Sequence, residues 1–270
     1  MLPLIKTYIP PREILMPKIE EVLYSGYIAQ GEAVENFERK FEEFIGSGYT
    51  LSLNSGTAAL HIALILAGVK EGDEVISTAM TAEPTNVAIK MVGAKVRWAD
   101  VDYETGNIAP KAIENAINEK TKAIIVVDYA GTPVDVKSIQ EISLKYNIPV
   151  IEDAAHALGT TYNGKKTGNH FPFTVFSFQA IKHLTTVDGG ALQIQDKELY
   201  EKGKLIRWFG LDKKLTRLEN DIQIQGYKYH MNNVNATIGL VQLETIEEPK
   251  PIEKEPEIVK EEKIQEEEPI

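Results

Sequence analysis

The sequence predicts an α/β fold with a mostly parallel sheet that helices cover on both faces. Short apolar segments alternate with longer segments of helical periodicity along most of the chain. The apolar segments are nearly continuous, which is typical of parallel strands that are buried on both sides. The length of 270 residues and the hydrophobic content of 43% suffice for one large domain with a substantial core.

The predicted elements follow one another in a regular order. Two helices are expected first, at 16–23 and 34–44, and the second places four apolar residues on one face. Strands are then expected at 50–53, 74–77, 95–98, 123–127, 149–152, 174–178 and 191–195. Helices are expected between them at 57–67, 85–92, 111–118 and 136–146. In such a sheet, ligands bind beyond the carboxyl ends of the strands.

Composition divides the chain into two parts. Residues 1–246 form the expected folded domain, whereas residues 247–270 contain ten Glu, four Lys and four Pro, with no aromatic residue and no glycine. A segment of this kind cannot bury enough apolar surface to fold alone. We therefore expect a disordered tail, with partner binding as an alternative.

Composition also excludes several classes of site. The chain has no cysteine, which excludes disulfides, cysteine-ligated zinc and iron–sulfur clusters, and its five histidines lack metal-ligand spacing. The net charge of −11 comes without a basic face, which argues against nucleic-acid binding. Neither a signal peptide nor an apolar run long enough to span a membrane is visible, so we expect a cytoplasmic protein that does not bind membranes.

One lysine occupies a distinctive position between two predicted strands. Lys182 lies in a polar turn after strand 174–178, and Gly189 and Gly190 lead into the next strand. This order places a single amine at the edge of the sheet, where burial in a cleft lowers its pKa and makes it nucleophilic. A solvated loop lysine is the ordinary alternative. Ser177, five residues earlier, is a candidate phosphate donor or an ordinary strand serine.

An acidic residue ends the apolar segment 150–153. Asp153 is expected to be partly desolvated, and such a carboxylate requires a cationic partner. The protonated pyridine nitrogen of a bound cofactor is a partner of this kind. The ion pair keeps the pyridine ring of that cofactor protonated and therefore able to accept electrons. His156 can then bond the phenolic oxygen of the ring or cover the ring. A helix cap is the alternative for Asp153, and a core histidine is the alternative for His156.

A small-residue segment opens the helix at 57–67. Gly56 lets the backbone approach a ligand closely, Ser55 and Thr57 carry hydroxyls, and the first N–H groups of a helix bind phosphate well. An ordinary N-cap is the alternative. Amine, acid and anion-binding helix start are together the requirements of a pyridoxal phosphate site.

Taken together, these segments resemble the DegT-type sugar aminotransferases, a family of fold-type-I pyridoxal phosphate enzymes. The resemblance covers residues 1–246. It implies an aspartate-aminotransferase-like large domain with a mostly parallel mixed sheet, and a small C-terminal domain that is truncated in this chain. Its motifs lie at 25–31, 34–38, 54–60, 72–76, 150–156, 176–178 and 226–232.

The resemblance implies a role for each residue around the cofactor ring. Lys182 matches the lysine that forms the Schiff base, Asp153 matches the partner of the pyridinium nitrogen, and His156 matches the neighbouring Gln/His position. Ala82 stands where the family usually has an aromatic residue stacked on the ring. Stacking is therefore expected from another side chain.

The resemblance also implies the phosphate contacts. Gly56, Thr57 and Ser177 match phosphate-binding positions of the same chain. In the family, a Gly-x-Asn-x-Arg segment reaches the active site of the partner subunit. In this chain, Lys228 stands at the Asn position of that segment and His230 at the Arg position. We expect Lys228 to contact the partner's phosphate as a cation.

The implied function is a pyridoxal-phosphate-dependent aminotransferase that converts a nucleotide-linked keto sugar to an amino sugar, with glutamate as donor. Members of the family are usually homodimers. Two alternatives remain: a catalytically inactive cofactor-binding scaffold or partner subunit, and a pyridoxal phosphate deoxysugar dehydratase. Lys182 favours amino transfer, since dehydratase relatives carry histidine at that position.

Overall fold

The structure is a computed structural model that describes residues 7–246. The predicted tail at 247–270 lies outside the described residues. The helices are α1 (Arg12–Tyr24), α2 (Glu32–Ile45), α3 (Gly56–Leu66), α4 (Glu83–Met91), α5 (Pro110–Ala116), α6 (Val136–Tyr146), α7 (Lys197–Arg207) and α8 (Asn233–Ile246), with a short 3-10 turn η1 (Tyr129–Gly131). The strands are β1 (Tyr49–Leu53), β2 (Glu74–Ser77), β3 (Lys95–Trp98), β4 (Thr121–Val127), β5 (Val150–Asp153), β6 (Thr161–Tyr162), β7 (Lys165–Lys166), β8 (Phe173–Ser177) and β9 (Gly190–Ile194).

A seven-stranded sheet runs through the domain in the order β1-β9-β8-β5-β4-β2-β3. Strands β8, β5, β4, β2 and β3 pair in parallel, whereas β9 is antiparallel to both of its neighbours, β1 and β8. The predicted mostly parallel mixed sheet is therefore confirmed. Each predicted strand is present within two residues of its expected ends. The hairpin of β6 and β7 forms a separate small sheet that the sequence did not predict.

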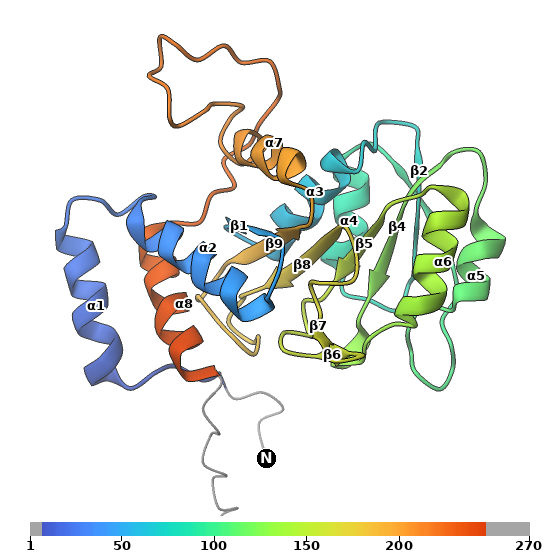
Figure 1. Ribbon diagram of the computed structural model, residues 1–270, viewed down its shortest axis with the longest axis horizontal. Coiled ribbons are helices and arrows are strands. Elements are labelled where there is room, and N and C mark those ends of the chain that lie inside the picture. The colour runs from blue at the N-terminus through green and yellow to red at the C-terminus, as the bar shows by residue number, and fades with distance from the viewer. Residues whose placement is uncertain (1–6, 247–270) are drawn as a thin grey trace, which may run out of the picture.

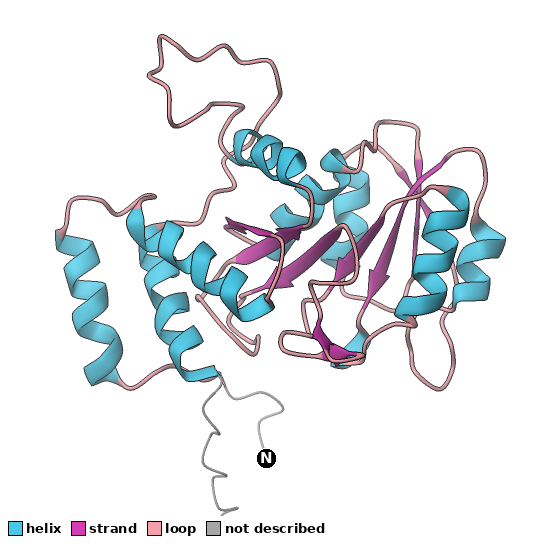
Figure 2. Ribbon diagram, in the orientation of Figure 1, coloured by secondary structure: helices cyan, strands magenta, loops and turns pink. Residues whose placement is uncertain are grey.

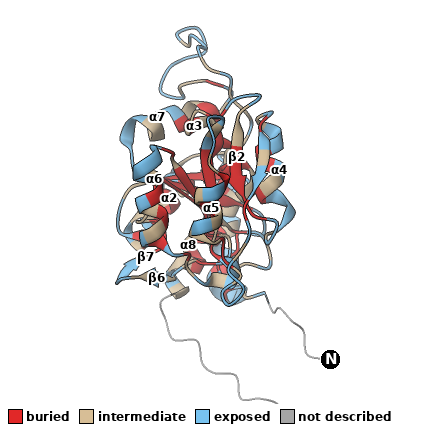
Figure 3. Cartoon of the chain, turned by 90° about the vertical axis from the view of Figure 1, so that its right-hand side faces the viewer, coloured by how far each residue is buried: buried red, intermediate tan, exposed pale blue. Residues whose placement is uncertain are grey.

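Helices cover both faces of this sheet (Figures 1 and 2). On one face, residues of α3, α4 and α7 pack in one cluster with the inward side chains of the strands. On the other face, α5 and α6 pack over β4 and β5, and α2 and α8 pack over β8 and β9. Buried residues accordingly concentrate along the sheet in the centre of the domain, as Figure 3 shows. This is the three-layer arrangement that continuous apolar strands require.

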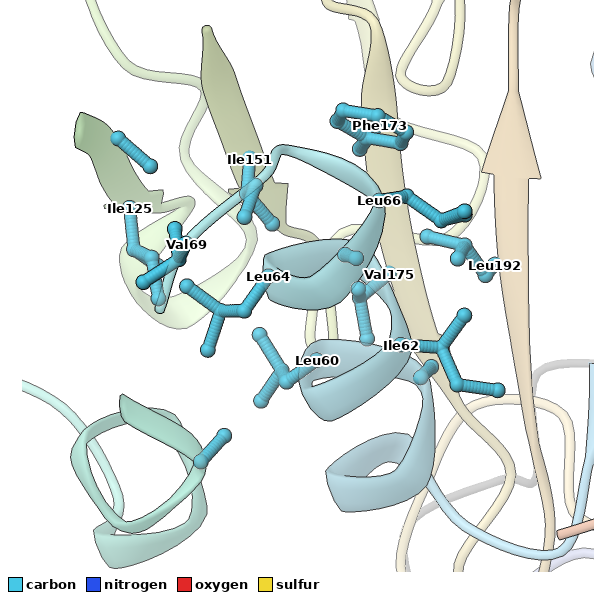
Figure 4. Packing of buried hydrophobic residues seen from close by; sticks show 14 of the residues in the cluster. Leu60, Ile62, Leu64, Leu66, Val69, Ile125, Ile151, Phe173, Val175 and Leu192 are labelled. Carbon is cyan, nitrogen blue, oxygen red and sulfur yellow. The ribbon is translucent and has the colours of Figure 1, made fainter. Parts of the chain in front are cut away.

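The most deeply placed helix is α3, which is apolar around most of its circumference. Leu60, Ile62 and Leu64 are at most 2% exposed. They lie among strand residues that include Ile151, Val175 and Leu192 (Figure 4). A helix that is apolar all round is stable only when it is enclosed. The packing therefore fixes the first turn of α3 at the carboxyl edge of the sheet.

Helices α7 and α8 were not predicted from the sequence. A buried ion pair holds α7 in place, with 2.5 Å between Arg207 Nη1 and Glu38 Oε1 of α2. Helix α8 packs against α2 and α1, burying Ile238 and Val241 against Leu15. Within residues 7–246, no helix combines the length and apolarity that a membrane span requires.

Candidate active site

A cavity of about 500 Å³ opens at the carboxyl ends of the parallel strands. Its wall is built from the ends of β4, β5 and β8 and from the first turns of α3 and α4. This is the position at which open α/β sheets bind ligands. Six of the seven residues predicted for the site line this one cavity: Gly56, Thr57, Asp153, His156, Ser177 and Lys182.

The start of α3 forms one end of the cavity. Ser55 caps the helix, because its Oγ accepts the N–H of Ala58 at 3.1 Å. The N–H groups of Gly56 and Thr57 belong to the first turn, which has no intrahelical acceptors for them. The N-cap expected as the ordinary alternative is thus present, and it leaves two donors of the same turn at the cavity wall. A phosphate group fits this position.

Two glycines allow the backbone to pack tightly at this end. A Cβ on Gly56 would lie 3.2 Å from Ser177 Cβ, so α3 and the end of β8 approach each other closely at this point. A Cβ on Gly190 would lie only 2.6 Å from the backbone nitrogen of Gly56. The start of β9 therefore supports the first turn of α3 by direct backbone contact, and this contact excludes any larger residue.

Asp153 is the last residue of β5 and is 5% exposed. Its Oδ2 accepts a hydrogen bond of 2.7 Å from Thr85 Oγ1, and its Oδ1 accepts the N–H of Ala155 at 3.2 Å. Burial raises the pKa of this carboxyl, whereas the two hydrogen bonds and the nearby charges of Lys182 and His156 lower it. A cationic group in the cavity would further favour the charged form of Asp153.

Lys182 lies in the turn after β8, where its backbone N–H bonds Gln179 O at 2.9 Å. Its side chain is half-buried in the cavity wall. Burial lowers the pKa of this amine, and the negative charge of Asp153 partly opposes the change. A lysine with a lowered pKa has a larger fraction of the neutral, nucleophilic form at neutral pH.

His156 lies on the exposed side of the same cavity. Partial burial and the charge of Lys182 lower its pKa, whereas Asp153 raises it. The imidazole is therefore mostly neutral at pH 7, because its ordinary pKa is already about 6.5. A neutral imidazole can either donate or accept a hydrogen bond.

The structure does not bring Lys228 to this cavity. Lys228 is exposed, and its backbone forms an isolated antiparallel β-bridge with Trp208. Its carbonyl oxygen accepts a hydrogen bond from Asn54 Nδ2 at 3.3 Å. Its expected contact with the phosphate of a partner subunit stays a prediction. Ala82 does line the cavity, and the aromatic side chains of the wall are Tyr129 and His156.

The polar residues of the wall that sequence reasoning missed include Thr85, Asp128 and Tyr129. Asp128 follows the apolar strand β4 directly, as Asp153 closes β5. The signal that identified Asp153 was thus present for Asp128 also. Thr85 carried no such signal, because its role depends on the approach of α4 to β5.

Comparison with known proteins identifies the family to which this chain belongs. The sequence matches the DegT/DnrJ/EryC1/StrS aminotransferase family over residues 12–255, which is most of the chain. The chain belongs to the DegT/DnrJ/EryC1/StrS aminotransferase family. Aminotransferases of this family are enzymes that bind pyridoxal phosphate. The resemblance stated from the motifs is therefore confirmed, together with the fold class.

Individual proteins of known sequence or structure also align with most of this chain. An uncharacterized protein of Methanocaldococcus jannaschii, MJ1066, is 41% identical over 237 residues, which are 85% of this chain and 61% of that relative. The chain thus spans 61% of the length of this relative. The structure of AtS13 from Actinomadura melliaura is 40% identical with a TM-score of 0.87, covering 91% of this chain and 68% of AtS13. The sugar aminotransferase CalS13 from Micromonospora echinospora is 35% identical with a TM-score of 0.86, and the alignment covers 91% of this chain and 69% of CalS13.

The residues of the cavity fit the cofactor of the family. The first turn of α3 offers backbone donors in the space beside Ser177, which suits a phosphate. Asp153 provides a buried carboxylate for a cationic ring nitrogen, and Lys182 provides an amine of lowered pKa on the same wall. The chemistry and the charge of the wall therefore agree with pyridoxal phosphate.

Proposed function

We propose that the whole protein is a pyridoxal-phosphate-dependent aminotransferase that converts a nucleotide-linked keto sugar to an amino sugar. The observation that supports this proposal most strongly is that Lys182 and Asp153 line one cavity with the first turn of α3. Asp153 ends β5 and Lys182 lies in the turn after β8, so their convergence depends on the fold. Family membership and the similarity to the sugar aminotransferase CalS13 support the sugar substrate.

In this proposal, each side chain has a defined task. When bound, pyridoxal phosphate supplies an electron sink for negative charge that develops at the amino-bearing carbon. Lys182 attaches the cofactor and, once released, moves a proton at that carbon through its Nζ. Asp153 holds the ring nitrogen protonated, and His156 hydrogen-bonds or covers the ring. Gly56, Thr57 and Ser177 bind the phosphate.

The proposal extends to the donor and the assembly. We assign glutamate as amino donor, a homodimer as the active form and the cytoplasm as its location. Lys228 is then the residue that reaches the phosphate bound by the partner subunit. Its exposed position away from the cavity of its own chain supports this assignment.

The decisive experiment is an absorbance spectrum of the protein with pyridoxal phosphate, repeated on Lys182→Ala and on Lys70→Ala, a surface control outside the cavity. We expect wild type and Lys70→Ala to show the band of lysine-bound cofactor, and Lys182→Ala to lack it. A band that survives in Lys182→Ala would show that another amine holds the cofactor and would overturn the assignment.

Turnover then separates amino transfer from the alternatives. We expect glutamate to yield 2-oxoglutarate in the presence of cofactor and a keto-sugar nucleotide to yield an amino sugar. Bound cofactor without 2-oxoglutarate would favour an inactive scaffold or partner subunit. Loss of a sugar hydroxyl without amination would favour a deoxysugar dehydratase, although the presence of Lys182 argues against that reaction.

A further inference from the structure

A second carboxyl group lies in the cavity wall beside Asp153. Asp128 directly follows β4, and its backbone N–H bonds the carbonyl oxygen of Asp153 at 3.1 Å. The two residues thus lie at the carboxyl ends of neighbouring parallel strands, Asp153 as the last residue of β5 and Asp128 just after β4. Asp128 is 1% exposed and is one of the residues of the cavity wall. An acid so deeply buried requires an explanation, because unpaired buried charge is unfavourable.

The hydrogen bonds of Asp128 are incomplete. Its Oδ1 accepts the N–H of Val134 at 3.1 Å. Its Oδ2 is buried and has no hydrogen-bond partner among the described residues. Buried polar atoms are normally paired, so the unpaired Oδ2 of a residue in the cavity wall calls for a partner. Oδ1 is therefore held by a contact within the chain, whereas the capacity of Oδ2 to accept a hydrogen bond is unused.

The surroundings favour a protonated Asp128 before a ligand binds. Burial is the main cause, and the negative charge of Asp153 adds to it, so that the pKa of Asp128 is raised to about 7. Glu152, on the opposite face of β5, is also acidic and its pKa is raised by burial and by Asp128. The other titratable groups of the cavity wall are Glu83, Tyr129, His156, Lys182 and Asp188.

We propose that Asp128 is a second acidic contact for the cationic ring that Asp153 binds: Asp128 holds a proton on Oδ2 until a cation enters the cavity, and then releases it. The O–H bond of the carboxyl breaks, its electron pair stays on Oδ2, and the proton passes to a solvent or buffer base. This inference rests on the proposed function, since it takes the ring nitrogen of pyridoxal phosphate as the cation. Asp128 thus contacts the ring directly and couples its binding to proton release.

The test measures protons released on binding by calorimetry at pH 7, in two buffers that differ in ionisation enthalpy. The ligand is pyridoxine 5′-phosphate, which has no aldehyde and therefore cannot bond Lys182 covalently. Asp128→Asn preserves the shape and the acceptor for Val134 N–H but cannot ionise. Asp128→Ser provides a second neutral variant if the amide prevents folding. Glu83→Gln is the control, because Glu83 is an exposed acid of the same wall.

We expect wild type to release about half a proton more than Asp128→Asn at pH 7, as a group with a pKa near the working pH requires. As the pH rises from 6 to 8, the Kd of wild type should decrease by a factor about tenfold larger than the factor for the variant. Glu83→Gln should match wild type. Equal proton release by wild type and Asp128→Asn overturns the inference while leaving the proposed function intact. A wild-type protein that binds neither this ligand nor pyridoxal phosphate overturns both.

Discussion

Thr85 and Asp153 are joined by a hydrogen bond of 2.7 Å between Thr85 Oγ1 and Asp153 Oδ2. This bond links the first turn of α4 to the end of β5 inside the cavity wall. Because the hydroxyl donates to a buried carboxylate, it stabilises the charged form of Asp153 and opposes the rise in pKa that burial causes. The start of one helix therefore favours the charged form of the acid that the proposed function requires.

Replacing Thr85 by valine should weaken binding of pyridoxal phosphate. Thr85→Val removes a donor to a charged acceptor, a contact worth about 1.5–3 kcal/mol, so we expect the Kd to rise at least about tenfold. A fluorescence titration measures the Kd. Thr85→Ser retains the hydroxyl and should restore most of the affinity. Wild-type affinity in Thr85→Val would mean that Asp153 does not depend on this donor.

Replacing Gly190 by alanine should displace the first turn of α3. The new Cβ would lie 2.6 Å from the backbone nitrogen of Gly56, and overpacking of this kind costs about 1–3 kcal/mol. We expect lower stability in urea unfolding and a loss of cofactor affinity.

The control for this change is Gly164→Ala, at a φ of +77° with no atom within 4 Å of the new Cβ. Left-handed backbone costs alanine about 1–2 kcal/mol, so the two variants should lose similar stability. Only Gly190→Ala should bind the cofactor more weakly. Equal affinities in the two variants would show that backbone contact at Gly190 does not position the phosphate site.

Removing the charge of Glu38 should destabilise the domain strongly. Glu38 pairs with Arg207 at 2.5 Å, and its Oε1 also accepts the N–H of Ser52 at 2.9 Å. Glu38→Gln leaves the buried guanidinium without a counter-charge, so we expect a loss of about 3 kcal/mol in the free energy of unfolding. Urea unfolding of Glu43→Gln, which breaks the exposed pair with Arg39, should give a midpoint close to wild type.

The parts of the fold that the sequence predicted correctly depend on local pattern. Continuous apolar runs identified the strands, and the all-round apolar segment at 57–67 identified α3 within one residue. The convergence of Lys182 and Asp153 followed from the rule that carboxyl ends of parallel strands meet at one edge. Neither inference required knowledge of the strand order.

The parts that the sequence did not predict depend on contacts between distant segments. Helix α7 carries many charged residues, and its position is fixed by Arg207 and Glu38, which are far apart in the chain. The bond from Thr85 to Asp153 likewise joins residues 68 positions apart. Asp128 is different, because its position directly after β4 carried the same local signal as Asp153 and was therefore open to prediction.

The stability of the protein without ligand should depend on pH through Asp128. The pKa of this carboxyl rises from 3.8 to about 7 on folding, so between these values the folded state binds more protons than the unfolded state. Stability contributed by the neutral form is therefore present below pH 4 and is lost as pH rises to 7, by at most about 1.4 kcal/mol for each pH unit. Asp128→Asn cannot ionise and should escape this loss. Urea unfolding at pH 5, 6, 7 and 8 should show the variant gaining stability relative to wild type up to pH 7, with little further gain above it. A constant difference across this range would mean that Asp128 is already ionised in the folded protein at pH 5.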